Sequence, residues 1–112
     1  MTLTLKKLSD AEIRQIVERI RGASDPDRII LFGSAAREEL SSGSDVDLLV
    51  LFPEALSGDL RALRDSIRRS LNGLGLFFDV LTMLTKDFDR RKPVFGCISH
   101  TADKEGKVIY VR

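Results

Sequence analysis

The stretch that decides the fold reads IILFGS over residues 29–34 and resumes, ten residues later, as DVDLLVLF over residues 45–52. Each half contains a short apolar run rich in β-branched and aromatic residues, which is typical of a strand buried on both faces. Gly33 ends the first run abruptly. Pro53 ends the second, because proline cannot donate to a strand ladder. We therefore predict interior strands over about 29–32 and 46–52.

Helical patterns flank these strands. Ser9 is placed as an N-cap with Glu12 closing a capping box, and apolar residues follow at helical spacing until Gly22. Further elements are predicted as a short helix over 34–40, a helix over about 56–74, a strand over 76–83, a helix over 86–105 and a strand over 107–111. This alternation predicts an α/β fold in which helices pack on a small mixed sheet.

Composition narrows the class of protein. The 112 residues are 43% hydrophobic and 31% charged, so we expect one globular domain over residues 1–112. With a net charge of +1, the protein as a whole has no strong electrostatic attraction to nucleic acid or to an anionic membrane. Cys97 is the only cysteine and cannot form an internal disulfide, and residues 1–20 lack the apolar core of a signal peptide. We expect a cytoplasmic protein that does not cross a membrane.

Three acids lie where strands are predicted. Asp45 and Asp47 open the second strand, and Asp79 interrupts the third. Because strand side chains alternate, Asp45 and Asp47 project from the same face, and pairing of the strands would add Asp79 to one cluster. Uncompensated carboxylates repel one another, whereas Mg²⁺ binds such oxygens and is commonly completed by substrate phosphates. The sequence predicts an open cation site formed by Asp45, Asp47 and Asp79.

A phosphate-binding turn is predicted at Gly33 and Ser34. Glycine permits close backbone approach, and the start of the following helix offers free N–H groups. Ser34 can add a hydroxyl, and Arg37 can add guanidinium donors, although Arg37 is equally compatible with a solvated helix position. No Gly-Lys-Ser/Thr follows at P-loop spacing, so this would be a different kind of nucleotide site.

These residues resemble the nucleotidyltransferases with the DNA polymerase β palm fold, and specifically the small minimal nucleotidyltransferases. The signature of that family is Gly-Ser, ten residues and Asp-x-Asp, which stands here as Gly33-Ser34 and Asp45-Val46-Asp47. Asp79 and residues 105–110 are also similar, so the resemblance covers almost the whole chain. One departure is Glu38, where the family often has glycine. A second is that the sequence lacks the further substrate-binding domain of the larger families.

The resemblance implies transfer of AMP from ATP with two Mg²⁺ ions and release of pyrophosphate. By this resemblance Asp45 and Asp47 would bridge the metals, Asp79 would complete the metal beside the acceptor, and Gly33 and Ser34 would hold the β- and γ-phosphates. It also implies a partner, a HEPN-domain ribonuclease toxin, of which a tyrosine would be adenylylated. The expected function is therefore that of an antitoxin acting as a protein adenylyltransferase.

Two other functions stay open at this stage. The chain could neutralise its partner by complex formation without catalysis, or it could transfer a nucleotide to an RNA or a small molecule. The arginines of residues 61–69 are expected on a solvated helix face, with contact to RNA or an acidic partner as the alternative. His100 is expected in a structural or surface role, and Cys97 as a small core residue.

Overall fold

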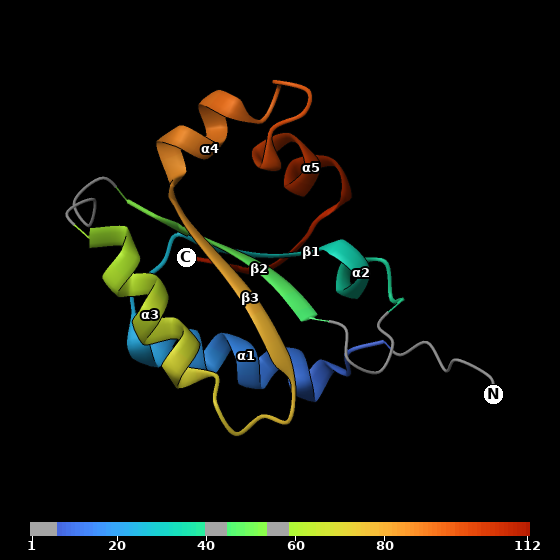
Figure 1. Cartoon of the computed structure of the whole chain (residues 1–112), viewed down its shortest axis with the longest axis vertical. Coiled ribbons are helices and arrows are strands. Elements are labelled where there is room, and N and C mark those ends of the chain that lie inside the picture. Colours follow the sequence, from blue (N-terminus) through green and yellow to red (C-terminus); the bar gives the residue numbers. More distant parts are fainter. Residues whose placement is uncertain (1–6, 40–44, 54–58) are drawn as a thin grey trace.

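The computed structural model describes residues 7–39, 45–53 and 59–112, which form an open four-stranded sheet with helices on both faces (Figure 1). The predicted α/β fold is confirmed. In chain order the elements are α1 (Asp10–Ala23), β1 (Arg28–Phe32), α2 (Gly33–Ala36), β2 (Asp45–Phe52), α3 (Leu60–Ser70), β3 (Phe77–Leu84), α4 (Thr85–Arg91), α5 (Ile98–Glu105) and β4 (Lys107–Val111).

The strand order in the sheet is β3-β2-β1-β4. β1 is antiparallel to both β2 and β4, whereas β2 and β3 are parallel. Parallel neighbours need a crossover connection, which α3 supplies between β2 and β3. β2, which begins with Asp45, and β3, which contains Asp79, are therefore adjacent and run in the same direction.

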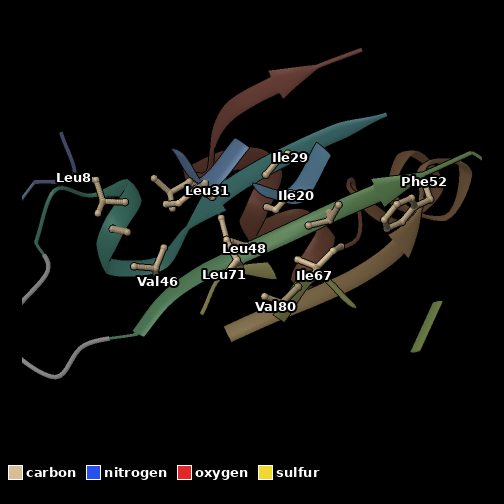
Figure 2. Close-up of a cluster of buried hydrophobic side chains, with 13 residues drawn as sticks. Leu8, Ile20, Ile29, Leu31, Val46, Leu48, Phe52, Ile67, Leu71 and Val80 are labelled. Atoms are coloured by element: carbon tan, nitrogen blue, oxygen red, sulfur yellow. The ribbon is translucent and has the colours of Figure 1, made fainter. Parts of the chain in front are cut away.

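One face of the sheet packs against α1 and α3. Ile16 and Ile20 of α1 and Ile67 of α3 are fully buried there. Every second residue of β2 faces this layer, as expected for strand alternation (Figure 2). Those residues are Val46, Leu48, Val50 and Phe52.

The opposite face carries a smaller core under α4 and α5. Phe88 of α4 and Ala102 of α5 lie against Ile30, Leu49 and Leu51. β3 runs directly into α4, so this cover lies over the end of the sheet where β2 and β3 finish. Asp45 and Asp47 lie on this same face, at its other end, where β2 and β3 begin.

The entry into α1 agrees with the sequence. Glu12 N–H donates to Ser9 Oγ at 3.1 Å, and Ser9 N–H donates to Glu12 Oε1 at 3.0 Å. This is the predicted capping box, which satisfies two backbone donors that the helix itself cannot. Leu8, just before the cap, is buried and ties the start of the helix to the core.

Two helix predictions were wrong in extent. The helix expected over 86–105 is divided into α4 and α5, because Pro93 cannot donate within a helix and Gly96 has a φ of +92°. The helix expected over 34–40 is one turn, Gly33–Ala36. The helix expected over 56–74 is α3, Leu60–Ser70, and its predicted start lies outside the described residues.

Other surface features follow from this packing. Arg61, Arg68 and Arg69 of α3 are exposed, as expected, whereas Arg64 is half-buried. His100 lies 2.9 Å from the Lys92 carbonyl through Nδ1, in keeping with a structural role. Cys97 is half-buried at the N-cap of α5 rather than in the core, because the break between α4 and α5 brings it to the surface. Within the described segments, no helix has the length and apolar character needed to cross a bilayer.

Phe88 anchors α4 to the sheet and is 1% exposed, whereas Phe95 in the α4–α5 connection is 89% exposed. We expect Phe88→Ala to lower the free energy of unfolding by roughly 3–5 kcal/mol, because it leaves a cavity in the smaller core. The matched control Phe95→Ala should change it by less than about 0.5 kcal/mol. Urea denaturation followed by circular dichroism measures both, and equal losses would contradict this account of the smaller core.

Candidate active site

The turn at Gly33 joins the end of β1 to α2. Gly33 has a φ of +69°, a conformation that glycine adopts without steric strain. A Cβ built on Gly33 would collide with Oδ2 of Asp47 and lie 3.2 Å from its Cγ. Glycine is therefore required here both by its backbone conformation and by the close approach of the Asp47 carboxylate.

The strand registers determine what surrounds Asp47. In the β1–β2 ladder Asp47 is opposite Phe32, the residue before Gly33. In the β2–β3 ladder it is opposite Asp79. Asp47 thus lies between the Gly33 turn on one side and Asp79 on the other, and Asp45, two residues earlier, projects from the same face.

The acids lie at the uncovered end of that face. Asp45 and Asp79 are exposed and Asp47 is half-buried, whereas the next residue of β2 on this face, Leu49, is fully buried. Figure 1 shows α4 continuing from the end of β3, away from α2. The structure therefore brings Asp45, Asp47 and Asp79 together beside Gly33, on a surface that a substrate can reach.

The electrostatics of the group centre on Asp47. The pKa of its carboxyl is raised above the ordinary 3.8, first by partial burial and then by the negative charges of Asp79 and Asp45. The Arg37 guanidinium acts in the opposite direction and lowers this pKa. Arg37 also pairs with Glu39, with Nε 3.2 Å from Oε2. The guanidinium is thus near enough to act on the acid group, but it is exposed and held by its own ion pair.

Glu38 stands where the family often has glycine, and its backbone adopts a conformation that favours glycine. Its φ is +60°, in the left-handed region, directly after the C-cap of α2. This is the position at which helices commonly end with glycine, because a side chain costs roughly 1–2 kcal/mol in that conformation. The chain keeps the turn without the glycine, and Lys7 Nζ lies 3.6 Å from Glu38 Oε1.

The donor set is compatible with hard divalent cations but does not enclose one. In the described part of the chain, no three acidic, histidine or cysteine side chains form a group that could by itself hold a metal. Nor does any ion pair among the described residues involve Asp45, Asp47 or Asp79. Carboxylates open to solvent suit a cation whose remaining ligands are water and substrate phosphates.

Sequence reasoning missed one residue of this surface. Phe77 begins β3, pairs with Asp45 in the ladder and is 69% exposed. It precedes Asp79 by two residues and therefore faces the same side of the sheet. The signal was present in the alternation of residues 76–83, because Phe77 lies two residues before Asp79.

The raised pKa of Asp47 predicts that the substitution Asp47→Asn increases the stability of the fold in a pH-dependent manner. Folding disfavours the charged form, so above the folded pKa the carboxylate lowers stability, and below 3.8 both folded and unfolded states are protonated. The Asn variant should therefore have the higher Tm at neutral pH, and this gain should disappear as the pH falls through that window.

Asp103→Asn, on the exposed side of α5, is the matched control. It should leave the Tm nearly unchanged, as most surface substitutions do. Thermal melts from neutral pH to below 3.8 make the comparison. A gain for Asp47→Asn that persists at the acidic end would show that charge repulsion is not its cause.

Comparison with known proteins agrees with this geometry. A protein from Sulfolobus solfataricus, a candidate nucleotidyltransferase of known crystal structure, superposes with a TM-score of 0.59 at 20% identity, over 90% of this chain and 79% of that one. This likeness concerns the fold. No curated protein matches the sequence significantly. The family model described as "Nucleotidyltransferase domain" matches residues 11–96, which include nearly all of α1, the Gly33 turn and all three acids. On this match, the chain belongs to the nucleotidyltransferase domain family.

Proposed function

We propose that this chain transfers AMP from ATP to a hydroxyl group of a protein and thereby silences a HEPN-domain ribonuclease toxin. The family supports nucleotidyl transfer in general. The observation that carries the proposal is the placement of Asp47 between the Gly33 turn and Asp79, at the solvent-exposed end of one face of the sheet. The tyrosine acceptor and the toxin partner rest on the resemblance to minimal nucleotidyltransferases.

Nucleotidyltransferase domains generally use divalent metals and nucleoside triphosphates. Asp45, Asp47 and Asp79 are the residues that would hold the Mg²⁺ ions. When bound, such ions neutralise charge on the phosphates and on the attacking and leaving oxygens of an in-line displacement. Asp47 is central to this role because it is adjacent to both of the other acids and to Gly33.

The Gly33 turn would bind the phosphates that leave as pyrophosphate. The lack of a side chain on Gly33 allows close backbone approach, and the Ser34 hydroxyl can donate to a phosphate oxygen. α2 is only four residues long, so its dipole contributes less than the predicted longer helix would. Arg37 pairs with Glu39 through Nε, which leaves its Nη groups as the donors for a phosphate oxygen.

The acceptor hydroxyl would approach from the β3 side. In an in-line displacement the attacking oxygen and the leaving group lie on opposite sides of the phosphorus. With the leaving phosphates at the Gly33 turn beside β1, the opposite side is β3, where Asp79 lies across Asp47. Asp79 is therefore the carboxylate best placed to orient the acceptor hydroxyl and accept its proton.

Two alternatives remain distinguishable from this proposal. A stoichiometric antitoxin would neutralise the ribonuclease without modifying it, and its activity would not depend on Asp79. Transfer to an RNA or a small molecule would use the same acids with another acceptor. The open face of the sheet is compatible with each, so the nature of the modified molecule decides between them.

Nucleotide binding should depend on the Gly33 turn. Gly33→Val should weaken ATP binding by at least about tenfold, because the side chain displaces Asp47 and strains the backbone. Arg37→Ala should have a smaller effect, because it removes one contact. Gly22→Val is the matched control, since nothing lies within 4 Å of a Cβ at that glycine. Calorimetric titration with ATP and Mg²⁺ measures all three, and normal binding by Gly33→Val would place the triphosphate elsewhere.

Transfer should depend on Asp79. We expect Asp79→Asn to bind ATP but to lower the rate of AMP transfer by at least about a hundredfold, the scale of a lost acid–base contribution. The measurement is intact-mass spectrometry of the proposed HEPN-domain ribonuclease partner, after incubation with ATP and Mg²⁺. The wild type should add AMP units and the variant none. Inhibition of the ribonuclease without any added mass would establish the stoichiometric antitoxin instead.

A further inference from the structure

The turn that follows α2 fixes the backbone of Glu38 and Glu39. Glu39 N–H donates to the Ser34 carbonyl at 2.8 Å, and Glu38 N–H donates to the Ala35 carbonyl at 3.2 Å. With Glu38 in the left-handed conformation, these two bonds form the Schellman arrangement that ends many helices. The backbone of Glu39 is therefore held at one place relative to α2, although its side chain is exposed.

Arg37 lies between this turn and the acid group. Its backbone N–H donates to the Gly33 carbonyl at 3.3 Å, and Gly33 is the residue that approaches the Asp47 carboxylate. The side chain of Arg37 therefore starts one turn of chain from that carboxylate. In agreement with this geometry, the guanidinium charge lowers the pKa of Asp47.

Despite this position, Arg37 pairs with Glu39. Its Nε lies 3.2 Å from Glu39 Oε2. Within the described segments, no ion pair joins the guanidinium to any of the three acids. A guanidinium near several carboxylates ordinarily forms a charge-assisted pair with one of them, and often a bidentate pair. Here Glu39 is that carboxylate, two residues along the chain and on a fixed backbone.

A direct pair between Arg37 and Asp47 would compete with a cation. It would occupy carboxylate oxygens that a divalent ion needs as ligands. Arginine stays charged at every pH at which the protein is folded, so deprotonation cannot release such a pair. Only another anion can hold the guanidinium elsewhere, and Glu39 is the carboxylate that the structure shows in contact with it.

We propose that Glu39 is a positioning residue that holds Arg37 away from Asp47 and so keeps the acid group open to a divalent cation. The inference rests on the proposed function in one respect, because it takes the acids to be the cation ligands. Holding Arg37 through Nε also leaves both Nη groups available to a phosphate oxygen. Glu39 itself touches neither the acids nor the substrate in this role.

Cation binding without nucleotide tests the role of Glu39. The probe is Mn²⁺ alone, which takes the same oxygen ligands as Mg²⁺ and is measured through the loss of its free-ion EPR signal. Glu39→Gln keeps the shape of the side chain and removes its charge. It should raise the Kd for Mn²⁺ by at least about fivefold, because the released guanidinium pairs with Asp47.

Glu38→Gln is the matched control, since it removes one negative charge from the same turn at a residue that lies beside Lys7. It should change the Kd by less than about twofold. An unchanged Kd in Glu39→Gln, or an equal rise in both variants, would overturn the positioning role.

A double-mutant cycle with Arg37→Ala separates positioning from simple loss of charge. Arg37→Ala should bind Mn²⁺ at least as tightly as the wild type, because no guanidinium remains to compete. In that background Glu39→Gln should change the Kd by less than about twofold. A loss of the same size in both backgrounds would show that Glu39 acts only through its own negative charge, and the positioning role would be wrong.

The outcomes separate this inference from the proposed function. If the cycle behaves as expected but the partner protein gains no AMP, the positioning role stands and the proposed transfer fails. If AMP is transferred while Glu39→Gln binds Mn²⁺ normally, the transfer stands and the positioning role fails. If the wild type binds no Mn²⁺, the acids are not a cation site and the positioning role is overturned with that assignment.

Discussion

The register of β2 between β1 and β3 is the constraint on which the site depends. Side chains alternate along a strand, so a slip of one residue would turn the acids of β2 into the larger core and turn its buried valines, leucine and phenylalanine out of it. The observed register buries Val46 and Leu48 under α1 and α3 and places Asp45 and Asp47 on the opposite face. The same register aligns Asp47 with Asp79. The strand register that buries the larger core is therefore the same register that assembles the acid group.

Unequal cover of the two faces keeps the acids accessible. α1 and α3 bury the first face along the whole of β2, from Val46 to Phe52. On the second face the core under α4 and α5 contains Leu49 and Leu51 of β2 but not Asp45 or Asp47. Strong negative potential therefore gathers on open sheet rather than in the interior, where three like charges would be far more costly.

The Gly33 turn links this electrostatic group to the backbone. Asp47 occupies the space that a side chain at Gly33 would need, so the carboxylate and the turn are positioned by one contact. The αL conformation at Glu38, three residues after Ala35, closes the one-turn helix that follows. Here the chain tolerates local strain near its reactive groups, as functional sites often do.

The amino-acid sequence by itself determined the element types and the residues that could carry chemistry. Alternation and apolar runs indicated the strands, the capping box defined the start of α1, and the spacing from Gly33-Ser34 to Asp45 and Asp47 indicated a phosphate and cation site. These are local properties, readable within a few residues.

Only the tertiary structure decided that β2 and β3 are parallel with Asp47 opposite Asp79, that residues 92–97 separate two helices, and that Phe77 is exposed beside the acids. Each depends on pairing or packing between segments far apart in the chain, which no local pattern specifies.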